Sequence, residues 1–237
     1  MITKAEKLYG KTVRRFMRMV NPVKKMIINT HCMTHKYINN KALELLKNQG
    51  YVRQYKCYSI YIDSINDGVV WADQDFKSTN HFYHLTEKRG LYGFSNLLDE
   101  CRYYHTLSFR YLEHGDVAMS MFYLGAACHL IQDATVPHHV NNRLLKSHRK
   151  FELFIIKNIA LGHSFETKQN IKRYNNLEDY IENNALLANS AYLKFKNIQD
   201  RDERYMKVAS MIIQEAQITT AGFMLDFYEK LRCKIDC

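Results

Sequence analysis

The sequence is poor in residues that interrupt regular structure, with two prolines and nine glycines among its 237 residues. It also lacks a series of short segments in which polar and apolar residues alternate, which is the pattern of sandwiches and barrels built from β-strands. These absences exclude collagen-like and Gly/Pro-rich low-complexity chains and favour helices. Because the chain is long enough to bury a substantial core, we predict an all-α fold with a single compact multi-helix domain.

Other sequence signals are missing as well. No apolar stretch approaches the roughly 20 residues that a membrane-spanning helix needs. The N-terminus has neither a continuous apolar core nor a small-residue cleavage site, so it does not resemble a secretory signal. The six cysteines form no CxxC pair, which predicts mostly reduced thiols, and Cys128 is expected to be a buried apolar one. Together these absences predict a cytoplasmic or membrane-peripheral protein.

Positive charge is concentrated at the N-terminus. Residues 1–25 contain eight lysines and arginines against Glu6 alone, a net charge of +7 out of the formal +10 of the whole chain. We expect residues 1–27 to form a basic arm and residues 28–237 to form the helical domain. The arm is either a plain solvated segment or a contact surface for anionic lipid or nucleic acid, with nucleic acid the less favoured partner. Near an anionic membrane surface each basic residue contributes about 1 kcal/mol.

Helix signals recur along the chain. Four segments have helical patterns: residues 41–49, 95–113, 116–133 and 204–231. The first stops at Gly50, a residue type that commonly follows a helix C-terminus, and the third starts at Asp116, a favourable N-cap. Residues 116–133 are apolar on nearly every side, which predicts a central helix. Residues 53–94, rich in Tyr, Asp and Asn, are expected to form an irregular loop that supplies site residues.

Possible metal ligands gather in residues 129–152. His129 precedes Asp133 by four positions, and His148 precedes Glu152 by the same interval, so each pair shares one helix face. Pro137 lies between the pairs and is followed by two histidines. One such pair is most simply a buried His–Asp hydrogen bond, but two favour a bound metal, because a buried carboxylate is costly unless it is paired. Imidazole and carboxylate without thiolate favour a catalytic zinc, or iron or manganese.

The segment FYLGAACHLIQDATVPHHVNN, residues 122–142, resembles the signature of the bacterial zinc-dependent phospholipases C. Four further segments are similar to elements of that family in the same order: NTHCM at 29–33, WADQD with NHFYH within 71–84, HRKFELF at 148–154 and AQITTAGFMLDFYEK at 216–230. The resemblance covers roughly residues 28–231. It implies a phosphodiesterase that cleaves a phospholipid to diacylglycerol and a phosphorylated headgroup.

The resemblance also implies two or three zinc ions, held in a cleft between helices by three groups of ligands. The first group is Asp73, His81, His129 and Asp133. The second group is His139, His148 and Glu152. The third is His31, with Asp133 bridging to it. Asp73, or a hydroxide held by the cluster, is the expected base or nucleophile, because metal ions can polarise the phosphorus and acidify water.

Some assignments have competitors in the sequence. His35 follows His31 by four residues and is the alternative third ligand, although His31 is preferred because it follows "NT" as in the family. Asp75 competes with Asp73, since "ADQD" offers both. His138 is expected to be a surface neighbour of His139, because the Pro-x-His spacing selects the second histidine.

Two other functions remain possible on the sequence alone. A single-strand-type zinc nuclease or nucleotidase shares the zinc arrangement, but its last ligands are His and Asp in a Trp-containing motif, whereas HRKFELF ends with Glu and has no Trp. The other is a non-catalytic, zinc-stabilised module that binds lipid or protein. Choline-preferring phospholipases carry aromatic residues where this chain has Gln74 and Ser78, so no choline cage is expected.

Overall fold

The computed structural model describes residues 32–90, 95–140 and 148–235, so the basic arm predicted for residues 1–27 lies outside the described residues. The described residues form eight α-helices and one 3₁₀-helix, η1, with no strand among them, which confirms the all-α prediction. The elements are α3 (Met33–Asn48), α4 (Val52–Ile60), α5 (Ile62–Ala72), η1 (Gln74–Asn80), α6 (Leu97–Glu113), α7 (Val117–Asp133), α8 (His148–Ala160), α9 (Leu177–Phe195) and α10 (Arg201–Ile235). Within this part of the chain, no helix combines the length and the apolar character needed to cross a membrane.

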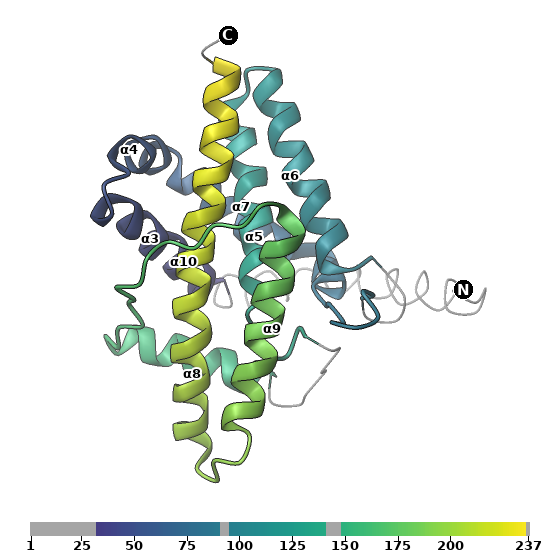
Figure 1. Ribbon diagram of the computed structural model, residues 1–237, viewed down its shortest axis with the longest axis vertical. Helices are drawn as coiled ribbons and strands as arrows, with labels where there is room; N and C mark the ends of the chain where they lie inside the picture. The colour runs from purple at the N-terminus through teal and green to yellow at the C-terminus, as the bar shows by residue number, and fades with distance from the viewer. Residues whose placement is uncertain (1–31, 91–94, 141–147, 236–237) are drawn as a thin grey trace, which may run out of the picture.

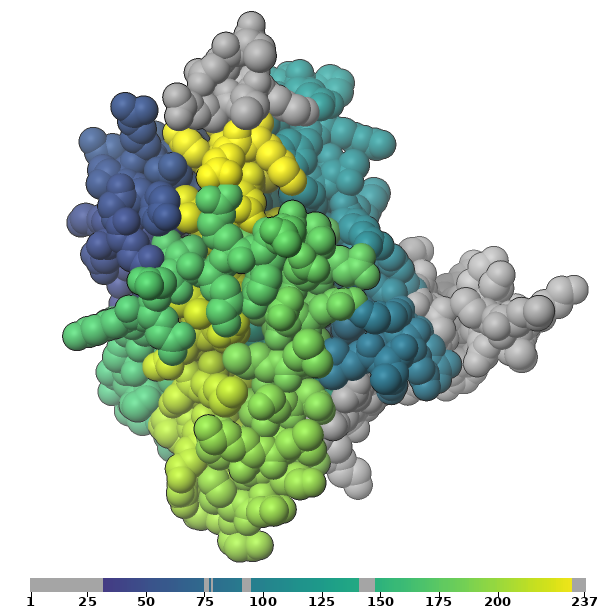
Figure 2. Space-filling model, in the orientation of Figure 1, coloured from purple at the N-terminus to yellow at the C-terminus, as the bar shows by residue number. Residues whose placement is uncertain are grey.

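Helix α7 is the central helix, as its apolar sequence predicts. It packs against α5 and α6 along most of its length and also touches α9 and α10. The long helix α10 runs through the whole molecule and packs against α3 and α9, and α8 crosses behind its lower half (Figure 1). Figure 2 shows α9, α10 and the segment before α9 covering the face toward the viewer.

Two large hydrophobic clusters divide the interior of the described structure, beside a minor one of Cys32, Val69 and Val70. The larger one contains residues of every α-helix from α3 through α7, of α9 and of the C-terminal half of α10. Fully buried side chains such as Ile65, Leu124 and Met121 lie within it. The smaller one joins α3, α8, α9 and the N-terminal half of α10, around Phe151 and Ile212. Helix α3 contributes to both clusters, so it fixes the position of α8 relative to α7.

The predicted helix boundaries agree with the structure where capping signals are present. The carboxylate of Asp116 accepts a hydrogen bond from the Met119 amide at 3.0 Å and so caps α7. Gly50 follows α3 with a φ angle of +88°, a conformation that a glycine adopts without strain. Cys128 is fully buried, as expected, and belongs to the larger hydrophobic cluster.

The prediction of an irregular loop over residues 53–94 is wrong for its first half. Residues 52–60 and 62–72 form α4 and α5, and among the described residues from 74 to 90 only η1 is helical. The polar residues of α5 hid a helical spacing, in which Ile65, Val69 and Ala72 are all fully buried while Asp63 and Asp67 face solvent. Burial of this face against α7 outweighs the low helix propensity of the polar residues.

Helices α5 and α7 cross at a pair of glycines. A Cβ atom added to Gly68 would lie 1.8 Å from the backbone oxygen of Phe122, and one added to Gly125 would lie 2.0 Å from the backbone oxygen of Ile65. Because the obstacles are backbone atoms, neither position accepts a side chain without moving a helix. The crossing therefore sets how closely the C-terminal end of α5 approaches α7.

A half-buried histidine away from the ligand groups gives a pH-dependent contribution to stability. His105 of α6 lies among Phe109, Phe223 and Phe227, with ring centroids 4.9 to 6.3 Å away. Burial, aided by the positive charge of Lys230, lowers the pKa of this imidazole to about 4. In the unfolded chain the pKa is about 6.5, so the unfolded state binds the proton more tightly. This contribution is fully present above pH 6.5 and is lost as the pH falls toward 4, by up to about 3 kcal/mol.

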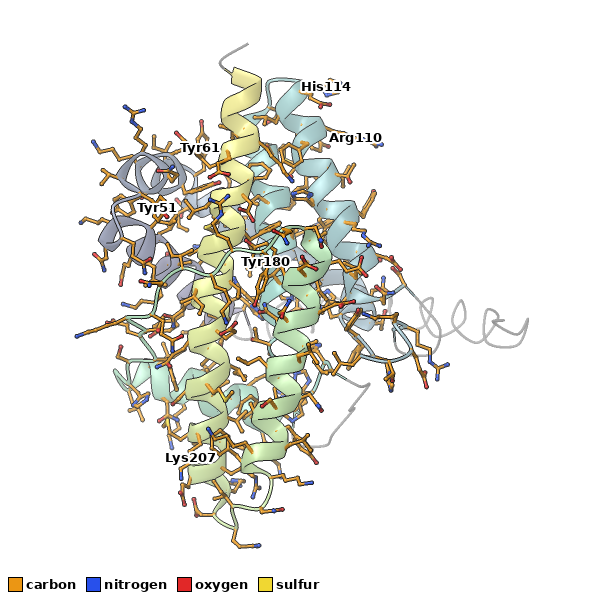
Figure 3. All side chains as sticks on the ribbon, in the orientation of Figure 1. Tyr51, Tyr61, Arg110, His114, Tyr180 and Lys207 are labelled. Carbon is orange, nitrogen blue, oxygen red and sulfur yellow. The ribbon has the colours of Figure 1, made fainter. Side chains whose placement is uncertain are left out.

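Replacing His105 with Leu should flatten the fall in unfolding free energy between pH 6.5 and 4, as measured by urea unfolding. The exposed His114, which ends the same helix (Figure 3), offers a matched control, because His114→Gln also removes one histidine from the end of α6. Equal pH slopes for His105→Leu and the wild type would show that His105 does not contribute.

Candidate metal centre

Asp133 lies at the centre of a buried group of histidines. It is the last residue of α7, and its side chain is only 4% exposed. One carboxylate oxygen, Oδ2, lies 2.8 Å from His81 Nδ1 and 3.2 Å from His129 Nε2. The other oxygen, Oδ1, lies 3.4 Å from His35 Nε2 and 3.9 Å from His139 Nε2. The two oxygens thus face different sets of imidazoles, as a bridging ligand would.

The first predicted group comes together around Oδ2 of Asp133. His129 lies one helical turn before Asp133 on α7, Asp73 is the C-cap of α5, and His81 follows η1. Oδ1 of Asp73 lies 3.8 Å from His81 Nδ1 and 3.7 Å from His129 Nε2, and these two nitrogens are 3.3 Å apart. The close crossing of α5 and α7 brings Asp73 to this position.

The second predicted group joins the turn after α7 to the first turn of α8. One side-chain ligand atom from each of His139, His148 and Glu152 lies within 4.8 Å of the others. His148 Nε2 is 3.0 Å from Glu152 Oε1, one turn later on α8. His139 is held by its other ring nitrogen, since Nδ1 lies 3.1 Å from the backbone oxygen of His81. That contact leaves Nε2 of His139 available for a metal ion.

A short backbone bridge ties the two loop histidines together. Tyr83 and Val140 form an isolated parallel bridge, in which the Tyr83 amide donates to the His139 carbonyl at 2.9 Å. This contact keeps the segment that carries His81 next to the segment that carries His139. The first and second groups therefore share one backbone support.

The third group contains His35, the alternative to His31 as the third ligand. His31 lies outside the described residues. His35 belongs to the first turn of α3 and forms a candidate ligand group with His129 and Asp133. Its Nδ1 lies 2.9 Å from Oε1 of Gln132, which leaves Nε2 directed at Asp133.

A chain of buried amides supports His35. Gln132 donates to Asn39 Oδ1 at 2.8 Å and to Thr220 Oγ1 at 3.2 Å, and Asn39 donates to Asn66 Oδ1 at 3.0 Å. These bonds link α3, α5, α7 and α10. Ligands oriented by such outer hydrogen bonds are pre-arranged for a metal ion.

The expectation for His138 is wrong. We expected a surface residue, but His138 is only 8% exposed, and its ring stacks on that of His148 at 5.0 Å. The turn after α7 folds inward at Pro137, so both histidines of the pair face the interior. For the pair Asp73 and Asp75, Asp73 lies beside His81 and His129, whereas the side chain of Asp75 is outside the described part of the structure.

The donor atoms fit zinc better than they fit hydrogen bonds to one another. Oδ2 of Asp133 is buried without a hydrogen-bond partner among the described residues, although two imidazole nitrogens lie within 3.2 Å of it. Nε2 of His148 is in the same situation beside Glu152. Tetrahedral zinc with bonds of about 2.0–2.2 Å separates its ligand atoms by roughly 3.3–3.6 Å. Most contacts of the first group lie near that range, so the residues fit the ion.

Without a metal ion, the charges of the group are strongly coupled. Burial would lower the pKa of His129, but the carboxylates of Asp133 and Asp73 outweigh it and raise this pKa to about 9. Burial likewise would raise the pKa of Asp133, but the imidazoles of His139 and His129 hold it well below its usual range. For His139, burial dominates and lowers the pKa to about 4. The carboxylates of this group therefore stabilise positive charge among the imidazoles, whether a proton or a bound cation carries it.

Cys32 is a site residue that the sequence did not indicate. This fully buried thiol at the N-cap of α3 donates to Oδ2 of Asp73 at 3.6 Å. Burial, together with the nearby carboxylate of Asp73, raises the pKa of Cys32 far above its ordinary value, so the group remains a neutral donor. The signal was only its position next to His31, because the partner lies 41 residues away in sequence.

Comparison with known proteins agrees with this geometry. The family described as "Zinc dependent phospholipase C" matches residues 34–198, which include His35 and every described ligand candidate. No curated protein matches significantly. The fold is similar to the alpha toxin from Clostridium absonum and to the Clostridium perfringens alpha-toxin isolated from avian strain SWCP, each with a TM-score of 0.70 and 17% sequence identity. In both cases the match covers 84% of this chain and 63% of the toxin chain.

Proposed function

The chain belongs to the zinc-dependent phospholipase C family, and on that premise we propose that it hydrolyses the phosphodiester of a phospholipid to diacylglycerol and a phosphorylated headgroup. The observation that carries the proposal is the environment of Asp133, whose two oxygens face two separate sets of imidazoles at 2.8 to 3.9 Å. A metal site that only stabilised the fold would not need one carboxylate that contacts two sets of imidazoles.

We assign the ligands as three groups that meet at Asp133. The first is Asp73, His81, His129 and Asp133, and the second is His139, His148 and Glu152. In the third, His35 takes the place for which His31 was first considered. Zinc ions bound there would supply positive charge that polarises the phosphodiester and makes an attacking water more acidic.

Asp73 is the better of the two central carboxylates for the role of base. Its side chain is 21% exposed, whereas that of Asp133 is 4% exposed, so only Asp73 can reach a substrate and its water. The Cys32 thiol donates to Oδ2 of Asp73 and thereby fixes the orientation of the carboxylate. In this arrangement Asp73 receives the proton of the attacking water, and Cys32 is a positioning residue.

The turnover of the zinc-loaded protein tests this proposal. Hydrolysis of phospholipid or of a water-soluble phosphodiester should stop with chelator and return with zinc. Replacing Asp73 with Asn should lower kcat by about 10²- to 10⁴-fold with little change in KM, because the base acts mainly in the transition state.

Two comparisons make the test specific. Asp67→Asn removes an exposed carboxylate from the same helix, α5, and should leave both zinc content and turnover unchanged. Zinc content must be measured for both variants, because Asp73 is also a proposed ligand.

Rapid digestion of single-stranded DNA without lipid turnover would replace the proposal with the nuclease function. Bound zinc without turnover of either substrate would favour a non-catalytic module.

A further inference from the structure

A pocket lined by His138 adjoins the second ligand group, because the His138 ring stacks on that of His148. It has a volume of about 340 Å³ and lies between the turn after α7, helix α8 and the hairpin formed by α9 and α10. Its lining consists of Pro137, His138, Phe151, Tyr192, Lys196, Arg204, Tyr205 and Val208. Pockets of this size are at the small end of those that bind metabolites.

The charge of this lining has one sign. Lys196 and Arg204 bring two cations into the pocket, and none of the described side chains that line it is acidic. Neither cation forms an ion pair with a residue in the described part of the chain. An anion in this pocket would therefore meet two positive charges and no negatively charged side chain of the described lining.

Arg204 is held in place for such a ligand. One of its terminal nitrogens, Nη1, donates to the backbone oxygen of Ile198 in the loop between α9 and α10. The guanidinium group has five N–H donors in a fixed plane, so this anchor leaves others for a ligand. Tyr205 packs edge-on against Phe151 at 5.1 Å and gives the pocket a rigid aromatic wall.

A larger cavity of the described structure lacks this character. It has a volume of about 950 Å³ and is lined by Arg173, Asp226 and Glu229 among others. There Arg173 pairs with both carboxylates at 2.6 Å, and Lys230 is the other cation of the lining. The smaller pocket differs because its described lining has two cations and no acidic side chain.

We propose that the pocket between Lys196 and Arg204 binds the phosphate group of a small organic phosphate or of an anionic lipid headgroup. The two sources share the same recognition chemistry, in which a guanidinium and an ammonium group contact phosphate oxygens. The site is separate from the zinc ligands. It adjoins them through the stacked rings of His138 and His148, so it is one side-chain layer from the second ligand group.

The test compares phosphate binding by zinc-loaded full-length proteins in calorimetric titrations with glycerol phosphate. The double variant Lys196→Gln/Arg204→Gln should lose one class of binding site or weaken it by at least about tenfold, since it removes two charged hydrogen-bond donors. The control Lys194→Gln/Lys207→Gln makes the same change in charge at exposed positions on α9 and α10 outside the pocket (Lys207 is labelled in Figure 3) and should bind as the wild type does. Glycerol phosphate held by the zinc cluster should be unaffected in both variants.

The source of the phosphate is distinguished in a second arm. Short-chain phosphatidylglycerol is titrated into Asp73→Asn protein with and without the two pocket substitutions, so that slow hydrolysis does not disturb the measurement. Loss of lipid binding alone would identify a lipid headgroup site, and loss of glycerol phosphate binding would identify a site for free phosphates. If Arg204→Gln unfolds the protein, Lys196→Gln alone, at an exposed position, replaces the double variant. This single change should weaken binding severalfold. Equal binding of both probes by wild type and pocket variants would overturn the proposal, whatever the outcome for turnover.

Discussion

Replacing Asp133 with Asn should remove more than one zinc ion per chain and lower turnover by at least about 100-fold. The reason is the position of the two carboxylate oxygens, because Oδ2 faces His81 and His129 while Oδ1 faces His35 and His139. Asparagine keeps the shape but loses the charge and one of the two oxygens. Elemental analysis of protein purified without chelator, beside a phosphodiesterase assay, measures both effects.

Two companion variants sharpen this result. His35→Ala should lose no more than one zinc ion, since only one side of Asp133 depends on it. Asp116→Asn changes a carboxylate at the opposite end of α7 to another good capping residue and should change neither metal content nor turnover. Equal zinc losses in Asp133→Asn and His35→Ala would exclude the bridging role. A wild-type protein without any zinc would exclude the site itself.

The second large effect is expected from Gly125→Ala. The added Cβ would lie 2.0 Å from the backbone oxygen of Ile65, so α5 and α7 must move apart. The gain in helix propensity of about 1 kcal/mol does not offset this clash. We expect a net loss of at least about 2 kcal/mol of unfolding free energy, seen as a fall in Tm of several degrees. Because the same crossing places Asp73 beside His129, zinc affinity should fall as well.

The matched control for this variant is Ala118→Val, which adds bulk to α7 at an exposed position. It should change the unfolding free energy by less than about 1 kcal/mol, because only helix propensity is affected. Gly68→Ala should reproduce the Gly125→Ala result from the other side of the crossing, where the added atom meets Phe122. A Tm for Gly125→Ala equal to that of the control would contradict the close crossing.

Much of the centre could be predicted from local sequence. Residues 116–133 have an N-cap, a continuous apolar character and two possible ligands one turn apart, and all three features depend on neighbouring residues alone. The same is true of His148 and Glu152 on α8. The structure places both pairs as this spacing requires, with ligand atoms 3.2 and 3.0 Å apart.

The assignment of the third group could not be made from local features. His31 and His35 are both plausible from spacing, and the structure brings His35 to Asp133 through packing of α3 on α7 and α10. One signal was available, because His35, Asn39 and Ala42 continue the buried face of α3 toward its N-terminus. The contacts of His138 and Cys32 depend on segments far away in sequence, and no local pattern contains them.

The polar residues of α5 explain why an irregular loop was wrongly predicted for this part of residues 53–94. Asn66 reads as a loop residue by propensity, but its side chain accepts a hydrogen bond from Asn39 inside the molecule. Gly68 reads as an interruption, but it is the point of closest approach to α7. Propensity describes a residue alone, whereas both residues are determined by their partners on other helices.

The bridge between Tyr83 and Val140 has a consequence for the folding pathway. The contacts around it join positions that are 48, 58 and 97 residues apart, as in His129 with His81, His139 with His81 and His35 with Gln132. Contacts of such separation form late and slow the search for the native state. Helices α6 and α7, joined by a short turn, can pair early, whereas the ligand groups are complete only after α3 and α8 have docked. Bound zinc should therefore lower the rate constant of unfolding by a larger factor than it raises the rate constant of folding.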